Sequence, residues 1–139
     1  MAEQPTRILA VDFGDRRTGL AGTDFTGTIV TPLTALVGLK DAECAAAIAD
    51  LVDERDTELV VVGLPLTATG EEGPRAKRTM TFVKLLEKTL HCPVATYDER
   101  NTTDEAHALL AESGMKAAQR RRFADSVAAL VILKRFLGS

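Results

Sequence analysis

The chain of 139 residues contains only two cysteines and two histidines, so it has few thiol and imidazole groups that could act as nucleophiles, bases or zinc ligands. Cys44 and Cys92 are isolated in apolar surroundings, which favours buried thiols in a reducing cytoplasm over a disulfide. No Cys or His cluster has the spacing of a zinc site, and neither His91 nor His107 has a partner pattern typical of a ligand or a base. The sequence therefore offers neither a zinc centre nor a credible catalytic triad.

Long apolar segments, internal repeats and linkers are also missing. No apolar run approaches the ~18 residues of a membrane span, and the first five residues lack the basic start and apolar core of a secretory signal. Hydrophobic residues make up 45% of the chain, which is enough for a packed core. We therefore expect one cytoplasmic domain over residues 1–139, with 1–6 as a loose tail and no contact with a membrane.

The stretch over residues 8–19 carries the clearest chemical signal that is present. A short apolar run ends on Asp12, Gly14 permits a tight turn, and Arg16 and Arg17 precede a second apolar run. A carboxylate at the apolar end of a strand is costly unless a cation or several donors meet it. We interpret the cation as a metal ion.

Periodicity and turn residues predict an α/β fold. Strands are expected at 7–13, 18–24, 28–37, 58–63 and 94–97, and helices from Asp41 to about 55, from Pro74 to a break at 91–93, from Thr102 to Gly114, and over about 123–137. An antiparallel three-strand meander followed by strand–helix–strand crossovers gives a mixed five-stranded sheet, with two further parallel strands and helices on both faces. Pro32 favours an edge position for the third strand, and Asp41 is a suitable helix N-cap.

Three acids from distant parts of the chain are expected to meet at one edge of this sheet, one of them either Asp98 or Glu99. The first strand of the meander tends to be central, so the later parallel strands end on the same side as Asp12. Asp98 and Glu99 follow the last strand, and Asp125 lies in the first turn of the final helix. Each acid also has a simple structural explanation: turn amides for Asp12, a helix cap or an ion pair with Arg100 for Asp98 or Glu99, and a helix start for Asp125. Their joint position favours a functional site.

Clustered carboxylates of this kind are typical of divalent-metal sites. They repel one another, and burial raises their pKa unless a divalent cation is present. Mg²⁺ or Mn²⁺ takes oxygen ligands and leaves positions for water and a substrate phosphate. Two such ions can stabilise the attacking water and the leaving oxygen in phosphodiester cleavage without a Ser, Cys or His nucleophile.

Basic residues are concentrated locally, although a net charge of −3 at pH 7 does not by itself indicate a nucleic-acid-binding protein. Arg16 and Arg17 flank Asp12. A second group crowds one short segment before the final helix: Lys116, Arg120, Arg121 and Arg122. This segment fits a solvated charged loop as well as it fits a nucleic-acid contact.

Several motifs, taken in order, resemble one known family. They are Asp12-Phe-Gly14-Asp-Arg16-Arg17-Thr-Gly19, Val62-Gly63-Leu-Pro65, Gly70-Glu-Glu-Gly73-Pro74, Asp98-Glu99-Arg100 with Thr102-Thr103, and Asp125 with Ala128-Ala129. Over about residues 7–137 the chain resembles the YqgF family, also called the RuvX or Holliday-junction-resolvase-like family, whose members are described as pre-16S rRNA nucleases. Asn101 departs from the family pattern, in which a hydrophobic residue is commoner.

The resemblance implies an RNase H-like fold and a Mg²⁺- or Mn²⁺-dependent endonuclease acting on structured nucleic acid. By family position Asp12 and Asp125 are metal-binding acids, and the third catalytic acid is Glu99, with Asp98 as its rival. Basic residues are expected to contact substrate: Arg16, Arg17, Arg100, Lys116, Arg120, Arg121 and Arg122. The implied substrate is the 5′ end of pre-16S rRNA in ribosomal precursor particles, with branched DNA as the alternative.

Other functional classes remain open on the sequence alone. A non-catalytic nucleic-acid-binding or ribosome-associated factor would need the basic segment but not the acids. An ATPase of the actin or sugar-kinase type also begins with an Asp-x-Gly strand and turn, but it needs a duplicated domain, for which 139 residues leave no room. A two-fold junction resolvase favours a homodimer, whereas a monomer suffices for rRNA processing.

Overall fold

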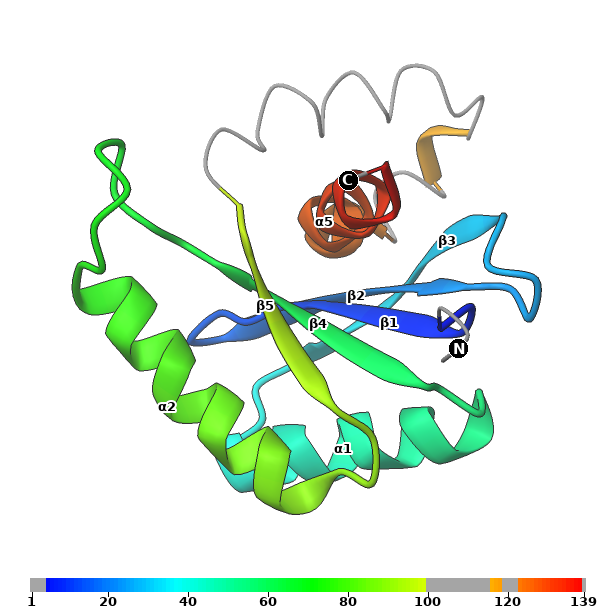
Figure 1. Ribbon diagram of the computed structural model, residues 1–139, viewed down its shortest axis with the longest axis horizontal. Coiled ribbons are helices and arrows are strands. Elements are labelled where there is room, and N and C mark those ends of the chain that lie inside the picture. The colour runs from blue at the N-terminus through cyan, green and yellow to red at the C-terminus, as the bar shows by residue number, and fades with distance from the viewer. Residues whose placement is uncertain (1–4, 100–115, 119–122, 139) are drawn as a thin grey trace.

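The computed structural model describes residues 5–99, 116–118 and 123–138, and its centre is a five-stranded mixed sheet (Figure 1). The strands are β1 (Ile8–Asp12), β2 (Arg17–Thr23), β3 (Val30–Val37), β4 (Leu59–Leu64) and β5 (Val94–Asp98). Their order is β3-β2-β1-β4-β5, with antiparallel β1–β2 and β2–β3 pairs and parallel β1–β4 and β4–β5 pairs. The predicted sheet is confirmed, with the Asp12 strand at its centre and the Pro32 strand at an edge.

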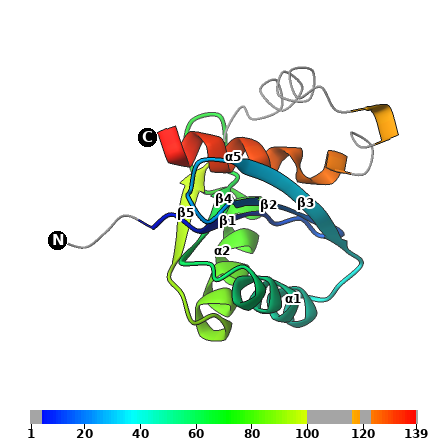
Figure 2. The same cartoon turned by 90° about the vertical axis from the view of Figure 1, so that its right-hand side faces the viewer.

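Two helices cover one face of the sheet and a third covers the other (Figure 1 and Figure 2). Helices α1 (Asp41–Glu54) and α2 (Pro74–Thr89) pack together on the first face, and α5 (Val127–Gly138), preceded by the 3₁₀ turn η1 (Ala124–Ser126), lies across the second. In the described part of the chain, no helix combines the length and the apolarity needed to cross a bilayer. The helix predicted from Thr102 to Gly114 lies outside the described residues.

The alternation of side chains along β1 explains the two apolar cores and fixes the direction of the acid. Leu9 and Val11 belong to the core that packs against α1 and α2, whereas Ile8 and Ala10 belong to the core that packs against α5. Successive side chains of a strand point to opposite faces. Asp12 therefore points to the face that α5 covers.

The sequence predicts the start of α2 correctly but not the cap of α1. Pro74 is the first residue of α2, as predicted. The prediction that Asp41 caps α1 is wrong: Lys40 is the N-cap, and Asp41 is the first helical residue. The Asp41 carboxylate instead accepts two hydrogen bonds from the guanidinium of Arg78, with N–O distances of 2.8 and 2.9 Å. The Asp41 side chain, which the local sequence pattern predicted to cap α1, thus connects α1 to α2 instead.

The final helix starts later than predicted because the chain is first anchored to the sheet. The helix expected over about 123–137 is divided into η1 and α5. The β2–β3 register shifts just before Leu20. There the Ser126 hydroxyl accepts a hydrogen bond from the Leu20 amide at 3.1 Å and donates one to the Leu33 carbonyl at 2.6 Å. This bridge holds η1, and with it Asp125, against the sheet.

Candidate active site

Two acidic side chains meet at the end of the sheet where β1 and β5 finish. Asp12 is the last residue of β1. Glu99 directly follows β5, and its amide donates a hydrogen bond to the Leu64 carbonyl at 3.2 Å. The two residues are partly buried, and their carboxyl groups are hydrogen-bonded to each other. The fold thus joins two acids that are far apart in the sequence.

The register of the strands distinguishes Glu99 from its neighbour Asp98. Tyr97 of β5 packs in the core beneath α5. Side chains two residues apart on a strand share a face, so Glu99 follows Tyr97 to the α5 side and Asp98 is directed to the opposite face. Gly63, the register partner of Tyr97, leaves the space for Glu99, because a Cβ at Gly63 would lie 2.9 Å from a Glu99 carboxylate oxygen. The structure therefore brings Glu99 to Asp12.

Burial raises the pKa of both acids, and the charge of Asp12 raises that of Glu99 further. The pKa of Glu99 rises to about 8, first because the group is buried, and then because of the charge of Asp12 and the hydrogen bond to it. Burial also raises the pKa of Asp12, while the hydrogen bond with Glu99 and the positive charge of Arg75 oppose that rise. Without a cation, the pair therefore holds a proton at neutral pH.

Arg75 is a site residue that the sequence analysis missed. It is the second residue of α2, and its positive charge lowers the pKa of both carboxyl groups. One signal was available, since Arg75 follows Pro74, which starts the helix after the loop that leaves β4. However, Lys77 and Arg78 also lie in the first turns, and the sequence does not show which of these cations faces the acids.

Asp125 lies beside the pair but turns to a different partner. Its backbone carbonyl packs so closely on Gly19, the register partner of Asp12, that a Cβ at Gly19 would overlap the carbonyl oxygen. Its side chain forms an ion pair with Arg17, with an N–O distance of 3.3 Å. Within the described ranges, no three His, Cys, Asp or Glu side chains stand close enough together to hold a metal ion. Of the expected acid cluster, the structure joins Asp12 to Glu99 and places Asp125 over β2.

The predicted basic residues have different surroundings. Arg17 is engaged by Asp125, whereas the neighbouring Arg16 is exposed and its backbone carbonyl accepts a hydrogen bond from Gly38. Lys116 is exposed. The remaining predicted contacts, Arg100, Arg120, Arg121 and Arg122, lie outside the described residues.

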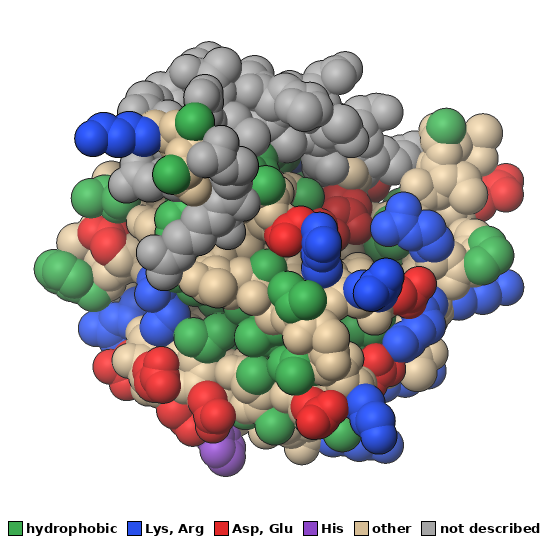
Figure 3. Space-filling view, turned by 180° about the vertical axis from the view of Figure 1, so that it is seen from behind, with side chains coloured by type: hydrophobic (Ala, Val, Ile, Leu, Met, Phe, Trp, Pro, Cys, Tyr) green, Lys and Arg blue, Asp and Glu red, His purple; other side chains and the backbone are tan. Residues whose placement is uncertain are grey.

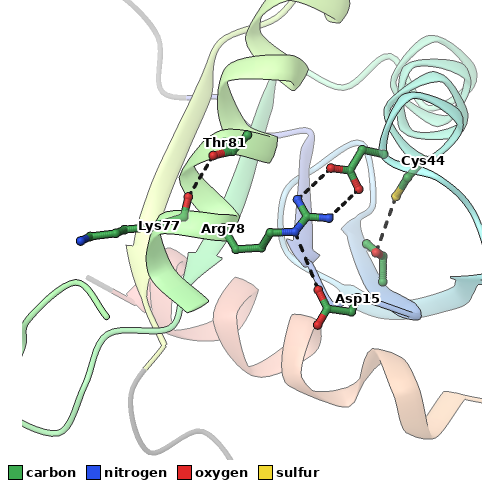
Figure 4. Close-up of polar contacts among 7 residues, drawn as sticks. Asp15, Cys44, Lys77, Arg78 and Thr81 are labelled. Atoms are coloured by element: carbon green, nitrogen blue, oxygen red, sulfur yellow. Dashed lines mark hydrogen bonds and ion pairs between the residues drawn. The ribbon is translucent and has the colours of Figure 1, made fainter. Parts of the chain in front are cut away.

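A cavity of about 260 Å³ opens between the β1–β2 turn and the start of α2. One wall is Phe13, which stacks on Phe82 of α2 with 4.0 Å between ring centroids. The guanidinium of Arg78 lies 4.9 Å from the centroid of Phe13, bonds to Asp41 and approaches the Asp15 carboxylate at 3.8 Å (Figure 4). Viewed from behind, acidic side chains are recessed between Lys and Arg side chains on the right of the molecule (Figure 3). The cavity therefore lies in a region of mixed charge at the end of the sheet.

Known relatives match the chain over nearly its whole length. A family model described as the Holliday junction resolvase RuvX matches residues 6–139. A protein of Chloroflexus aggregans named "Putative pre-16S rRNA nuclease" is 43% identical over 130 residues, which cover 94% of this chain and 92% of that protein. A protein of the same name from Roseiflexus sp. is 37% identical over 139 residues, covering 100% and 99%.

Solved structures of resolvases share the fold. The fowlpox virus Holliday junction resolvase superposes with a TM-score of 0.58 at 14% identity, covering 94% of this chain and 97% of that one. The RuvC protein of T. thermophilus, in complex with a Holliday junction substrate, gives a TM-score of 0.56 at 13% identity, covering 96% of each chain. These likenesses confirm the predicted RNase H-like fold. Together, the match over residues 6–139 and the relatives above show that the chain belongs to the RuvX family.

Proposed function

We propose that this protein is a metal-dependent endonuclease that hydrolyses phosphodiester bonds in structured nucleic acid. The observation that carries the proposal is the Asp12–Glu99 pair, in which two partly buried carboxyl groups are held in contact at the end of the sheet. Bringing two such groups together out of water costs free energy when no cation is present. A catalytic role explains this arrangement better than a contribution to stability does.

The donor set fits Mg²⁺ or Mn²⁺. Both acids supply oxygen ligands, which these ions prefer, and a divalent cation would offset the repulsion that raises the Glu99 pKa. We assign Asp12 and Glu99 as metal ligands and Asp125 as the third acid, because Asp125 lies over the strand next to Asp12. When bound, the metal supplies Lewis-acid stabilisation of the phosphate and an activated water.

The chain's own cations would hold the substrate backbone. Arg16 ends the exposed turn that follows β1 and Arg17 begins β2. The proposal extends to Arg100, Lys116, Arg120, Arg121 and Arg122. The ion pair between Arg17 and Asp125 is no obstacle, since its side chains are 64% and 40% exposed. An exposed pair of this kind contributes only ~0–1 kcal/mol, so a phosphate can compete for Arg17.

The favoured substrate is the 5′ end of pre-16S rRNA, processed in precursor ribosomal particles in the cytoplasm. The names of relatives that are 43% and 37% identical over nearly the full chain support this choice. As rRNA processing needs no two-fold enzyme, a monomer is sufficient for this function.

Branched DNA is the second candidate substrate, and the description of the matching family model favours it. Phosphate contacts alone do not select RNA over DNA, so the geometry of the acid pair serves either. A junction resolvase would in addition be expected to act as a symmetric homodimer. A purely binding, non-catalytic factor would have no use for the buried acid pair.

One assay separates these functions. A precursor rRNA 5′ segment and a four-way DNA junction are each incubated with the protein in Mg²⁺, in Mn²⁺ and in EDTA. We expect metal-dependent cleavage, faster on the RNA. Faster cleavage of the junction would make the protein a resolvase, and salt-sensitive binding without cleavage in any metal would make it a binding factor and overturn the nuclease proposal.

A further inference from the structure

The wall of the cavity at the start of α2 carries two arginines with different partners. Arg75 and Arg78 both line the cavity, opposite Gly14 and Asp15 of the β1–β2 turn. Arg78 is committed to the protein itself: it makes two hydrogen bonds with Asp41 and lies 3.8 Å from Asp15. Its charge is therefore largely compensated.

Arg75 is not committed in this way. Its side chain is exposed, and among the described residues no carboxylate lies within ion-pair distance of its guanidinium. Its charge nevertheless acts on both Asp12 and Glu99. Arg75 thus lines the cavity and places a positive charge within range of the acid pair, while its donors stay available to a ligand.

We propose that Arg75 is a substrate-positioning residue, whose guanidinium holds a backbone phosphate of the bound strand at this cavity, next to the phosphate being cleaved. A guanidinium presents parallel N–H donors that match two oxygens of a phosphate. The contact carries no sequence information and fixes the strand relative to Asp12 and Glu99. This inference rests on the proposed nuclease function.

The chain offers a matched control in the same helical turn. Lys77 carries the same charge, is exposed, and extends away from Arg78 and Asp15 (Figure 4). Lys77→Ala therefore removes one positive charge from the start of α2 without touching the cavity. Arg75→Lys keeps the charge and loses the parallel donors.

Binding is measured in an Asp12→Asn background, which prevents cleavage, by fluorescence anisotropy of a labelled precursor rRNA segment over a range of salt. Adding Arg75→Ala should weaken binding about ten-fold and reduce the slope of log K against log salt by about one. Lys77→Ala should leave both unchanged, and Arg75→Lys should restore the slope but only part of the affinity. Equal effects of Arg75→Ala and Lys77→Ala would overturn the proposal.

Metal affinity distinguishes substrate positioning from mere support of the acid pair. Calorimetric titration with Mn²⁺ should show that Arg75→Ala binds the ion as tightly as the unmodified protein or more tightly, because a nearby positive charge is gone. Weaker Mn²⁺ binding with unchanged RNA binding would show that Arg75 only organises the carboxyl groups. A melting temperature near that of the unmodified protein confirms that the variant is folded.

Cleavage assays of the protein with Asp12 intact distinguish a failure of the role given to Arg75 from a failure of the proposed nuclease function. If the unmodified protein cleaves and Arg75→Ala cleaves with the same kcat/KM, only the role of Arg75 fails. If it cleaves nothing in any metal, the nuclease function fails whatever the binding data show. We expect cleavage, with kcat/KM about ten-fold lower for Arg75→Ala.

Discussion

At the scale of single residues, the contact between the partly buried carboxyl groups of Asp12 and Glu99 lowers the stability of the folded state at neutral and higher pH. Burial raises the pKa of both acids, and the charge of Asp12 adds to the rise for Glu99. The folded chain keeps a proton on Glu99 up to about pH 8, whereas the ordinary pKa of a glutamate is 4.5. Because the folded state binds more protons in this window, a rising pH favours the unfolded state.

This difference predicts the pH dependence of stability in metal-free buffer. The stabilisation linked to the Glu99 proton is fully present below about 4.5 and is lost as the pH rises through about 8. Glu99→Gln should flatten this decline in melting temperature, while Glu72→Gln, in an exposed loop, should not change it. Thermal unfolding by circular dichroism across the window checks the prediction. An identical decline in Glu99→Gln would contradict it.

A second residue-scale prediction concerns the buried hydroxyl of Ser126. Ser126→Ala leaves the Leu20 amide and the Leu33 carbonyl without their side-chain partner, which should cost about 1–3 kcal/mol of unfolding free energy. Thr81→Ala is the control, since its exposed hydroxyl donates to the Lys77 carbonyl within α2 (Figure 4) and should cost less than about 0.5 kcal/mol. Urea denaturation measures both, and equal costs would show that the bridge to the sheet is not stabilising.

Sequence reasoning predicts some of these residues and misses others for identifiable reasons. Asp12 stands out because it ends an apolar run, which is a local pattern. The choice between Asp98 and Glu99 depends on the alignment of β5 with β4, and register between strands is not written in either strand alone. Similarly, the rotation of α2 about its axis determines that Arg75, and not Lys77 or Arg78, acts on the acid pair, and the sequence of α2 alone does not show this rotation.

At the scale of elements, η1 links the sheet to the final helix and sets the position of Asp125. Gly19 lets the Asp125 backbone lie directly on β2, and Ser126 bridges β2 to β3. The apolar spacing in this part of the chain predicts one continuous helix. Where the β2–β3 register shifts, Ser126 instead forms hydrogen bonds with both strands, and the regular α-helix starts only after it. This is a tertiary contact that the local pattern cannot predict.

The close approach at Gly19 can be tested directly. A Cβ at this position overlaps the Asp125 carbonyl oxygen, so Gly19→Ala must displace η1 and should lower both the melting temperature and the cleavage rate. Gly138→Ala, at the end of α5, meets no atom within 4 Å and should change neither. Differential scanning fluorimetry and the cleavage assay give the two readouts. A Gly19→Ala variant with unaltered melting temperature and rate would contradict the structural role given to this contact.

The positions of the five strands and the start of α2 can be predicted from the sequence pattern. Each strand begins within two residues of its predicted start, since apolar runs and turn residues act locally. The wrong prediction that Asp41 caps α1 arises from a contact that is not local: the Asp41 carboxylate accepts two hydrogen bonds from Arg78 of α2. Local rules thus place the elements, and contacts between elements decide how their ends are used.

At the scale of the whole molecule, the overall charge of −3 conceals a local arrangement suited to nucleic acid. The acids that would bind metal are partly buried at one end of the sheet, and Arg75 at the start of α2 places a positive charge near them, while Arg16 lies exposed on the β1–β2 turn. Substrate phosphates would meet these cations before the acids. In the proposed function, the residues that bind metal and substrate would therefore lie at the ends of β1 and β5 and at the start of α2.

The measurement that tests the central claim most directly is the single-turnover cleavage rate in Mn²⁺ of the unmodified protein beside Asp12→Asn, Glu99→Gln and Asp98→Asn. Losing a metal ligand removes several kcal/mol of transition-state stabilisation, so Asp12→Asn and Glu99→Gln should each cleave about 10³-fold more slowly. Asp98→Asn, directed to the other face, should stay within about three-fold of the unmodified rate. Full activity in Asp12→Asn, or a large loss confined to Asp98→Asn, would contradict the account.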